Sequence, residues 1–380
     1  MTHGFSRWPD VLFTPRVTET HQTAPFPLNP RGEGVRRLFI QIPCFNEAET
    51  LPLVLRSLPR RVAGYEDVRW LIVDDGSTDG THEVALNAGA DYVLRLGHNR
   101  GLAQAFTAGI DAALKLGADT IINTDGDNQY DAACIPELVA PILARRAAMV
   151  VGARPVSVIE HFSRTKKILQ RIGSRVVSLA SGLAIPDAPS GFRAMHWTAA
   201  IRLRTYNRYS YVLEHLIQAG RNNIPLVSVP VRVNPALRPS RLIRSIPEYL
   251  WRSGTTIVRI FALNRPLRFF GVVGVLLMLP GFVLGLRFLY EYLRGSGGGH
   301  VQSLILSAIL MLAGVVALAV GLLADLIAAN RATLEQLEHR QRLQELARPR
   351  DSGGAAADLL YGGVLIVRAA PTDVASVSAR

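Results

Sequence analysis

The sequence predicts an α/β fold: a mostly parallel β-sheet with helices on both faces, followed by a hairpin of two apolar helices. Two observations carry this prediction. Between residues 37 and 123, short apolar runs alternate with amphipathic helical patterns, which is typical of a parallel sheet covered on both sides. After residue 268, two apolar stretches follow that are each long enough to cross a membrane.

The composition narrows the class of partner. The chain has 380 residues, 49% of them hydrophobic, and a net charge of +12, which admits nucleic acid, an anionic membrane surface or a phosphorylated substrate. Arginines crowd into residues 232–268, directly before the first apolar stretch, and this placement favours membrane headgroups. No zinc finger, basic zipper or aromatic RNA-binding signature is present, so we do not expect nucleic acid as a partner.

The N-terminal residues 1–35 are expected to form a loose extension. Residues 1–34 lack the apolar core of a signal peptide and carry proline, arginine and acidic residues. Cys44 and Cys134 are far apart in the sequence and form no Cys-x-x-Cys motif, so we expect reduced thiols in a cytosolic part.

The first half of the chain supplies the elements of the sheet. We expect strands at 37–43, 70–73, 92–96 and 120–123, and helices at 46–58, 82–88 and 101–116. The 46–58 helix places Leu51, Val54, Leu55 and Leu58 on one apolar face, at the i, i+3, i+4 and i+7 positions. Ligands of parallel sheets bind at the carboxyl ends of strands, and three polar motifs fall there: I-P-C-F-N-E, D-D-G-S-T-D and T-D-G-D-N-Q.

The last of these motifs predicts a metal site. Asp125, Asp127 and Gln129 follow a short strand at alternating positions, so their oxygens can converge on one point. Carboxylate and amide oxygens suit a hard cation, Mg²⁺ or Mn²⁺, that keeps open positions for phosphates. The alternative is a polar turn, because Asp-Gly and Asn at a strand end are ordinary turn residues.

The acidic clusters as a set suit an activated sugar nucleotide. Carboxylates accept hydrogen bonds from base and ribose, while a metal neutralises the diphosphate. A dinucleotide-binding site would need G-x-G-x-x-G after the first strand, and neither this motif nor a Walker loop is present. For Asp75, helix capping and turn formation stay open as an alternative.

The motifs together resemble a known family. I-P-C-F-N-E-A-E-T-L, V-D-D-G-S-T-D-G-T and T-D-G-D-N-Q-Y are similar to motifs of family 2 glycosyltransferases of GT-A fold, in particular the dolichyl- and polyprenyl-phosphate sugar synthases. V-G-A-R, S-G-F-R and N-P-A-L-R-P-S-R extend the resemblance over residues 37–260 or so. The resemblance makes residues 36–235 a catalytic domain.

The resemblance also implies roles for single residues on the donor side. Nucleotide-sugar contacts are implied for Pro43, Phe45, Glu47, Val73, Asp75, Asp125, Gly126 and Asp127. Metal ligands are implied at Asp125, Asp127 and Gln129, with Mg²⁺ or Mn²⁺ as the cofactor. Phe45 stands where the family often has Tyr, and Gly126 where it often has Ala.

On the acceptor side, the implied phosphate-binding residues are basic: Arg154, Lys167, Arg171, Arg193 and Arg241. Arg154 and Arg241 join the two aspartates as catalytic residues. Arg241 stands where a Lys is common, so its assignment assumes that the charge is what counts. For Arg193 an alternative stays open, in which it pairs with a motif aspartate.

The C-terminal part predicts a membrane anchor. Residues 236–268 read as basic amphipathic interfacial helices, and 269–329 as two transmembrane helices whose cores are 269–286 and 303–324. A buried pair of soluble helices is the alternative. Because arginines precede the first span and Arg331 follows the second, we expect an inner (cytoplasmic) membrane protein of two passes, with the catalytic domain and both termini in the cytoplasm.

Beyond the spans, residues 330–380 are expected to form a cytoplasmic helix, over 330–347, and a flexible tail. The hairpin and the helix leave a homo-oligomer open. The tail contains L-L-Y-G-G-V-L-I-V, an edge strand whose place in the sheet the sequence does not give.

The predicted function is a membrane-bound inverting glycosyltransferase. It would move one sugar from a nucleotide-sugar donor (a UDP- or GDP-sugar) to a polyprenyl phosphate acceptor in the lipid bilayer. Two alternatives remain. A processive polysaccharide synthase would usually carry Q-x-x-R-W and more spans, which are not found here. A catalytically idle scaffold that recruits a flippase would not need the intact Asp125, Asp127 and Gln129.

Overall fold

The computed structural model of the chain describes residues 26–32, 34–155, 173–175, 177–178, 181–205, 211–235, 262, 266–295, 301–348 and 363–367. The chain forms two compact units: Met1–Leu237 together with Arg350–Arg380, and Arg238–Pro349. The first unit holds the sheet and its helices. The described residues of the second unit form two long helices.

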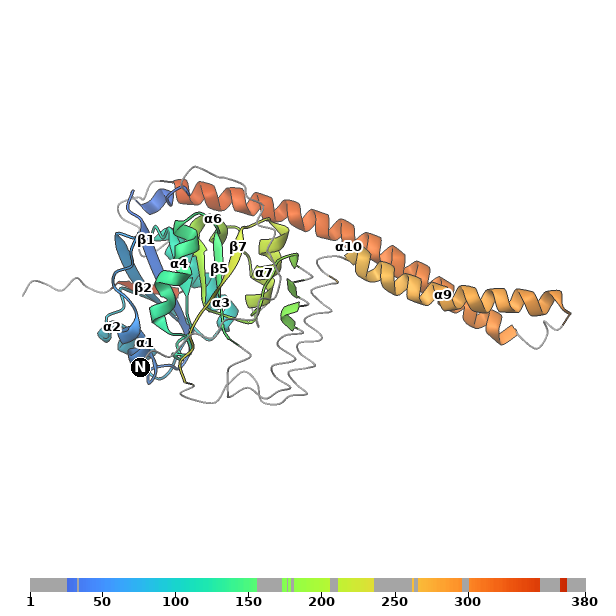
Figure 1. The fold of residues 1–380 in the computed structure, drawn as a ribbon, viewed down its shortest axis with the longest axis horizontal. Helices are drawn as coiled ribbons and strands as arrows, with labels where there is room; N and C mark the ends of the chain where they lie inside the picture. Colours follow the sequence, from blue (N-terminus) through green and yellow to red (C-terminus); the bar gives the residue numbers. More distant parts are fainter. Residues whose placement is uncertain are drawn as a thin grey trace, which may run out of the picture. The chain divides into compact units, whose positions relative to one another are not determined.

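The sheet has eight strands in the order β7-β5-β6-β4-β1-β2-β3-β8 (Figure 1). Within it, β6 and β8 run antiparallel to their neighbours, and the other pairs are parallel. The predicted mostly parallel sheet is therefore confirmed. The strands are β1 Arg37–Cys44, β2 Asp67–Asp74, β3 Tyr92–Leu96, β4 Thr120–Asn123, β5 Met149–Ala153, β6 Arg193–His196, β7 Leu226–Pro230 and β8 Gly363–Val367.

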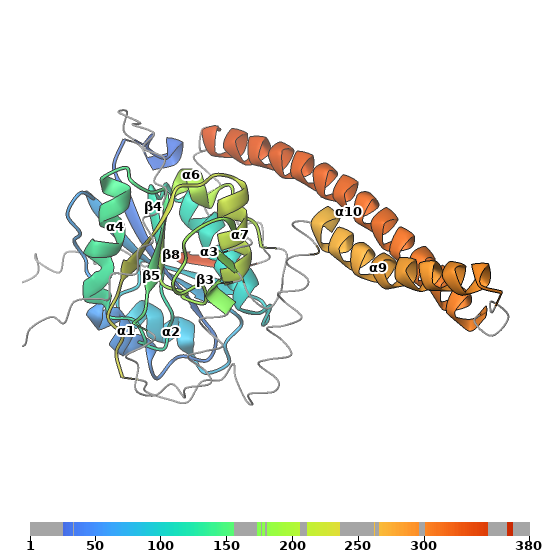
Figure 2. The same cartoon turned by 45° about the vertical axis from the view of Figure 1, so that its right-hand side comes forward.

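Helices cover both faces of this sheet, as predicted. On one face, α1, α2 and α4 contribute side chains to a continuous apolar cluster, whereas α3 packs against β1 and β2 on the other face, next to α7 (Figure 2). Among the described residues, the helices of this unit are α1 Leu51–Ser57, α2 Thr81–Asn87, α3 Leu102–Lys115, α4 Ile135–Leu143, α6 Trp197–Ala200 and α7 Val212–Arg221, with short 3₁₀ turns at Pro30–Gly32 and Ala132–Cys134.

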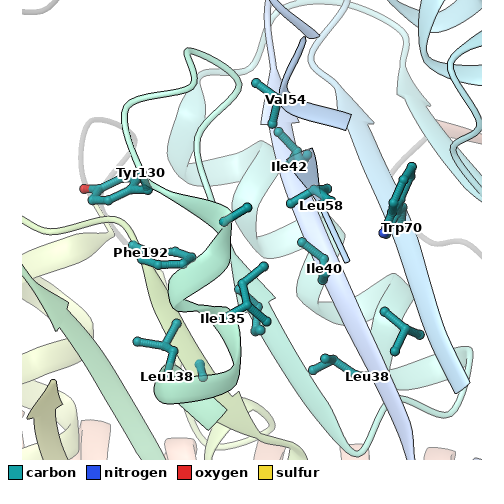
Figure 3. Packing of buried hydrophobic residues seen from close by; sticks show 14 of the residues in the cluster. Leu38, Ile40, Ile42, Val54, Leu58, Trp70, Tyr130, Ile135, Leu138 and Phe192 are labelled. Atoms are coloured by element: carbon teal, nitrogen blue, oxygen red, sulfur yellow. The ribbon is translucent and has the colours of Figure 1, made fainter. Parts of the chain in front are cut away.

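The central strand β1 shows how the sequence produces these two faces. Successive side chains of a strand point to opposite sides, and Leu38, Ile40 and Ile42 all join the cluster formed with α1 and α4 (Figure 3). Gln41 points the other way, because its Nε2 lies 3.5 Å from the carbonyl of Phe106 in α3. Both kinds of position are fully buried, which is why the strand reads as a nearly unbroken apolar run.

The first helix begins later than its apolar pattern predicts. The 46–58 prediction becomes α1 from Leu51 to Ser57. Asn46 has a φ of +53°, a conformation that cannot start a right-handed helix. The backbone N–H groups of Asn46 and Glu47 instead donate to Ser77 Oγ and Thr81 Oγ1, so the loop after β1 is tied to the loop after β2.

The described part of the predicted N-terminal extension is anchored to the domain. Asn29 is 2% exposed and donates from Nδ2 to the carbonyls of Leu114 and Ala118. Trp197 Nε1 donates to the Pro27 carbonyl over 2.6 Å. These contacts tie residues 26–32 to the end of the sheet opposite the candidate site.

In the described part of the second unit, α9 Pro266–Leu293 and α10 Val301–Ala347 form a hairpin and run side by side. Both are long and apolar enough to cross a membrane by length and composition. Small residues line their contact: a Cβ on Gly274 would lie 3.0 Å from the Gly314 carbonyl, and Ser307 Oγ donates to the Gly281 carbonyl over 2.6 Å. The predicted helix 330–347 is the continuation of α10.

The tail strand, which the sequence does not place, lies at the sheet edge. Strand β8 pairs antiparallel with β3, with Tyr92 opposite Val367 and Leu96 opposite Gly363. A segment that follows both apolar helices thus completes the sheet that precedes them.

Candidate active site

The candidate site lies at the carboxyl ends of three adjacent central strands. Phe45 and Glu47 follow β1, Asp75 follows β2, and Asp125 and Asp127 follow β4, and these strands stand in the order β4-β1-β2. The structure therefore brings together the three polar motifs that the sequence places at strand ends. This is the edge at which parallel sheets of this kind bind ligands.

The loop after β1 is held in a defined position. In addition to the bonds at Asn46 and Glu47, the Ala48 N–H donates to Asp79 Oδ2 over 3.0 Å, and Asn46 Oδ1 accepts from the Thr78 N–H over 3.0 Å. Phe45, at the start of this loop, is 40% exposed. An exposed aromatic ring on a fixed loop is available to a flat ligand such as a nucleobase.

Asp75 is buried, and each of its carboxylate oxygens accepts one hydrogen bond from the main chain. Its Oδ1 accepts from the Arg100 N–H and its Oδ2 from the Gly101 N–H, both over 2.8 Å, at the start of α3. Burial raises the pKa of Asp75 above its ordinary value, and the two backbone hydrogen bonds oppose that rise. These two bonds reach main chain 25 and 26 residues away, so they are not the local capping or turn contacts of the alternative, and each oxygen keeps a further lone pair for a ligand.

Asp125 and Asp127 form the electrostatic centre of the site. Burial and the neighbouring carboxylate of Asp127 raise the pKa of Asp125 to about 7, whereas the charges of Arg154 and Arg193 lower it. Asp127 Oδ1 accepts from the Gln129 N–H over 3.0 Å, a turn-type contact. A buried carboxylate whose pKa is raised by a second carboxylate beside it is a natural place for a cation.

Gly126, between these two aspartates, sits against the loop after β1. Its carbonyl lies 2.9 Å from Thr50 Oγ1, which also lies 2.8 Å from Glu47 Oε2, so the single hydroxyl hydrogen serves one of them at a time. A Cβ at Gly126 would lie 3.2 Å from Cys44 Sγ. The glycine that replaces the family's frequent alanine therefore fits a tight contact.

The segment after the aspartates is held by Asn234. Asn128 has a φ of +58°, and its carbonyl accepts from Asn234 Nδ2 over 3.0 Å. The Asn234 N–H donates to the Gln129 carbonyl over 2.9 Å. These contacts fix the backbone of the motif without using the side chains that the sequence assigns to the metal.

Arg154 is paired with an aspartate that sequence reasoning missed. Its Nε and Nη2 donate to Asp187 Oδ2 and Oδ1 over 2.7 and 3.1 Å. Burial alone would lower the pKa of Arg154, but its bonds to Asp187 and the nearby oxygens of Tyr130 and Asp125 raise it. A sequence signal existed, because Asp187 is the only charged residue between Arg175 and Arg193.

Arg193 is fully buried on β6. Its Nε donates to the Ser190 carbonyl over 2.9 Å and its Nη2 to the Ala188 carbonyl over 3.2 Å. Its Nη1 has no hydrogen-bond partner among the residues that the structure describes, and burial lowers the pKa of Arg193 to about 10. Neither of the two roles that the sequence suggests for it, phosphate contact or pairing with a motif aspartate, is among these hydrogen bonds.

Both main-chain polar groups of Gly191, its N–H and its carbonyl, are hydrogen-bonded, and the residue lies against Asp125. The Tyr130 hydroxyl accepts from the Gly191 N–H over 3.1 Å, and Asn123 Nδ2 donates to its carbonyl over 3.0 Å. Asn123 also donates to the Tyr211 hydroxyl. A Cβ at Gly191 would lie 3.2 Å from both carboxylate oxygens of Asp125. The S-G-F-R segment, residues 190–193, thus packs directly against the Asp125 carboxylate.

The remaining predicted residues divide into two groups. Pro43 and Val73 are buried and directly opposite each other in the β1–β2 pair. Lys167, Arg171 and Arg241 lie outside the described residues, as does most of the predicted interfacial segment 236–268.

The oxygen ligands that these residues offer fit a hard divalent cation. Asp125 and Asp127 offer carboxylate oxygens whose mutual repulsion a cation would relieve. Across the described ranges, no three His, Cys, Asp or Glu side chains converge as a complete metal-binding group. Further ligands would therefore come from the Gln129 amide, substrate phosphates or water.

The fold and this site define a glycosyltransferase of GT-A type, and comparison with known proteins gives the family. The profile described as glycosyl transferase family 2 matches residues 39–204. The undecaprenyl-phosphate mannosyltransferase of Micrococcus luteus is 30% identical, over 51% of this chain and 82% of its own. The chain belongs to glycosyl transferase family 2.

Other relatives extend this picture. Glycosyltransferase AglJ of Haloferax volcanii is 29% identical over 79% of this chain and 96% of its own, a match that includes more than the catalytic domain. The polyprenol monophosphomannose synthase of Mycolicibacterium smegmatis is 26% identical over 52% of this chain and 77% of its own.

Among solved structures, a glucosyl-3-phosphoglycerate synthase of Mycobacterium tuberculosis in complex with Mn²⁺, UDP-glucose and phosphoglyceric acid is 19% identical. The match covers 62% of this chain and 81% of that one, with a TM-score of 0.47. Likeness at this level is too distant to carry over a ligand.

Proposed function

We propose that this glycosyltransferase moves one sugar from a nucleotide sugar to a polyprenyl phosphate at a membrane surface, with inversion at the anomeric carbon. The observation that carries the proposal is the convergence of Asp75, Asp125 and Asp127 at the carboxyl ends of adjacent strands, in a family 2 chain that also contains two helices long and apolar enough to cross a membrane. Relatives named for transfer to undecaprenyl phosphate and for polyprenol monophosphomannose synthesis support the acceptor class.

The donor side falls to the loops after β1 and β2. Phe45 would lie against the base, and Glu47 and Asp75 would accept hydrogen bonds from base or ribose, with Pro43 and Val73 forming the backing of the pocket. The hydrogen bonds between the two loops support this assignment, because they hold the segment that begins with Phe45 and Glu47 against the segment that follows Asp75. Preorganised contacts of this kind reduce the entropy lost on binding.

The metal falls to Asp125, Asp127 and Gln129. A bound Mg²⁺ or Mn²⁺ would supply charge neutralisation of the departing nucleoside diphosphate. The chain's own part is to hold the carboxylates: Gly191 and the Thr50–Gly126 contact fix the two sides of the loop that carries them.

The phosphates fall to arginines. Arg154 uses Nε and one Nη2 hydrogen on Asp187, which leaves Nη1 for a phosphate oxygen beside Asp125. A guanidinium held in this way presents a directed charge, whereas a free side chain must be ordered first. We assign Arg193, Lys167, Arg171 and Arg241 to the same task on the basis of the family resemblance.

The reaction needs no strong general base. A phosphate monoester has a second pKa near 6 and is largely dianionic at pH 7. A phosphate oxygen of the acceptor would form a bond to the anomeric carbon while the bond from that carbon to the diphosphate oxygen breaks, and the electron pair leaves with the diphosphate. The chain therefore contributes alignment and charge stabilisation.

The hairpin would anchor the enzyme next to its lipid acceptor. Large apolar side chains on its outward faces are exposed, for example Leu276 at 65% and Leu312 at 66%, which suits contact with lipid. The pairing of β8 with β3 supports two crossings, because it joins chain from before α9 to chain from after α10. Both flanks must then lie on the same side of the membrane, and the arginine distribution favours the cytoplasmic side.

The test is product formation by the full chain in vesicles. Radiolabelled UDP- and GDP-sugars are offered with polyprenyl phosphate and Mg²⁺ or Mn²⁺, and the expected product is a lipid-linked monosaccharide. Asp127→Asn should lower the rate about a hundredfold, whereas the exposed Glu137→Gln removes one carboxylate and serves as the matched control. A polymeric product, no product at all, or full turnover in excess EDTA would contradict the proposal.

A further inference from the structure

We propose that the edge of strand β3 is a binding site for the chain's own C-terminal strand β8, and that this pairing positions the nucleotide-binding side of the active site. The pairing itself is independent of the reaction catalysed. The positioning role rests on the proposed function, since it assumes that Asp75 contacts the nucleoside.

The pairing covers the whole of β3. Every residue of β3 has an antiparallel partner on β8, from Tyr92 opposite Val367 to Leu96 opposite Gly363. In the strand order β8 stands at the end, so without it β3 would be an open edge. An open edge exposes a row of unpaired backbone N–H and C=O groups that bind another strand readily.

The covered strand leads directly to Asp75. After Leu96, the chain runs through residues 97–101, and the N–H groups of Arg100 and Gly101 hold the two oxygens of Asp75. The same connection is packed closely on the loop after β2: a Cβ at Gly76 would lie 2.6 Å from the carbonyl carbon of His98. The position of β3 therefore sets the position of the connection that holds Asp75.

The acceptor side is remote from this edge in the sheet. Arg154 follows β5, and three strands, β6, β4 and β1, separate β5 from β2. Loss of β8 would leave the end of β3 less ordered, and nucleotide binding would then have to order the 97–101 connection. The expected effect is a weaker donor affinity with an unchanged acceptor affinity.

A proline scan of β8 in the full chain tests the pairing. In an antiparallel ladder, successive N–H groups point alternately toward the partner and away from it. Proline removes an N–H and is tolerated on an edge strand only where that N–H points away. Val364→Pro and Ile366→Pro should therefore behave alike and differ from Leu365→Pro, and alanine at each position controls for the lost side chain.

Two readouts separate structure from function. Among Val93, Leu94 and Arg95, amide exchange should speed up at the N–H groups that point toward β8, for one parity of proline and not for the other. Calorimetry with UDP and with GDP, in the presence of Mg²⁺, first identifies the nucleotide that the native chain binds. The affinity for that nucleotide should fall about five- to tenfold in the proline variants that speed up exchange, and stay constant in the others. The KM for polyprenyl phosphate should not change.

A cysteine pair identifies the occupant of the edge. Arg95 and Val364 are direct partners, so cysteines at both positions should form a disulfide within one chain, whereas Arg95→Cys with Ile366→Cys, displaced by two residues, should not. A disulfide that joins two chains would overturn the proposal, because the occupant would then be a second copy.

The remaining outcomes are equally distinct. If amide exchange in β3 does not alternate between successive proline variants of β8, the pairing of β8 with β3 is overturned. Alternating exchange with constant nucleotide affinity would overturn the positioning role alone. If the native chain binds neither UDP nor GDP while exchange alternates, the proposed function and the positioning role fail together and the pairing stands.

Discussion

Arg154 and Asp187 share two side-chain hydrogen bonds, of 2.7 and 3.1 Å, and the charge of Arg154 lowers the pKa of the nearby Asp125 carboxyl. The Arg154 N–H donates to the same aspartate over 3.1 Å, so side chain and backbone are fixed together. The pair is almost completely buried, with side-chain exposures of 9% and 1%. In such a pair, removing one partner strands a buried charge.

We predict that Arg154 and Asp187 act as one unit. Arg154→Ala and Asp187→Ala should each lower kcat/KM, and the double variant should lose less than the sum of the two, with a coupling of about 1–3 kcal/mol. The matched control is the ion pair of Arg232 with Asp131, also 2.7 Å long but 60% and 28% exposed, where coupling of well under about 1 kcal/mol is expected. Equal coupling in the two cycles would refute the special role of the buried pair.

The pH dependence of stability should report on Asp125. Its pKa is raised to about 7, so the folded protein binds this proton more tightly than the unfolded chain does. The stabilisation is then fully present below about pH 4, the ordinary pKa of an aspartate, and is lost as the pH rises through 7. In metal-free protein, Asp125→Asn should therefore melt at a higher temperature than the native chain at pH 8, with a smaller difference in the same direction at pH 5.

Thermal unfolding with chelator at both pH values measures this difference, with Glu137→Gln as the surface control. Addition of Mg²⁺ or Mn²⁺ should reverse the order at pH 8, because the native chain gains stability from the bound ion and the variant does not. Identical melting of native chain and variant at pH 8 without metal would contradict the raised pKa.

The close packing of Gly191 against the Asp125 carboxylate can be tested by adding a methyl group. Gly191→Ala would place a methyl group 3.2 Å from both carboxylate oxygens, whereas Gly173→Ala meets no described atom within 4 Å and is the matched control. Neither glycine has a positive φ, so backbone strain is not involved. We expect Gly191→Ala to weaken activation by Mn²⁺ about tenfold or more while nucleoside affinity without metal stays constant. Titration of activity with Mn²⁺ measures the shift, and equal metal curves for the two variants would refute it.

Much of the sheet could be predicted because its signals are local. The strands at 92–96 and 120–123 were predicted at their observed bounds, since a buried strand is a short apolar run between turn residues. The start of α1 could not be predicted, because the N–H groups of Asn46 and Glu47 bond to side chains more than 30 residues away. The apolar period continues through such a loop without marking it.

The same distinction applies to the site. The aspartates of the site directly follow strands, so the local sequence is enough to identify them. Asp187 and Asn234 act across long separations, on Arg154 and on Asn128, and only the strand order brings them there. The place of β8 is a further case: the sequence shows a strand in the tail, but a backbone pairing with β3 leaves no periodic mark on either partner.

The hairpin allows a last prediction. A Cβ at Gly314 would clash with Met278 Cγ and lie 2.8 Å from the Gly274 carbonyl, so Gly314→Ala must push α9 and α10 apart. Gly271→Ala meets nothing within 4 Å, and both changes carry the same gain of about 1 kcal/mol in helix propensity. Relative to Gly271→Ala, Gly314→Ala should destabilise the hairpin by about 1–3 kcal/mol, the usual cost of overpacking, in thermal unfolding of the full chain in lipid nanodiscs. Nucleotide affinity should be equal in the two variants, because the proposed donor residues all lie between Pro43 and Gln129 in the other unit. If Gly314→Ala weakens nucleotide binding in a protein that is still folded, the hairpin contributes to the donor site and its proposed role as an anchor is wrong.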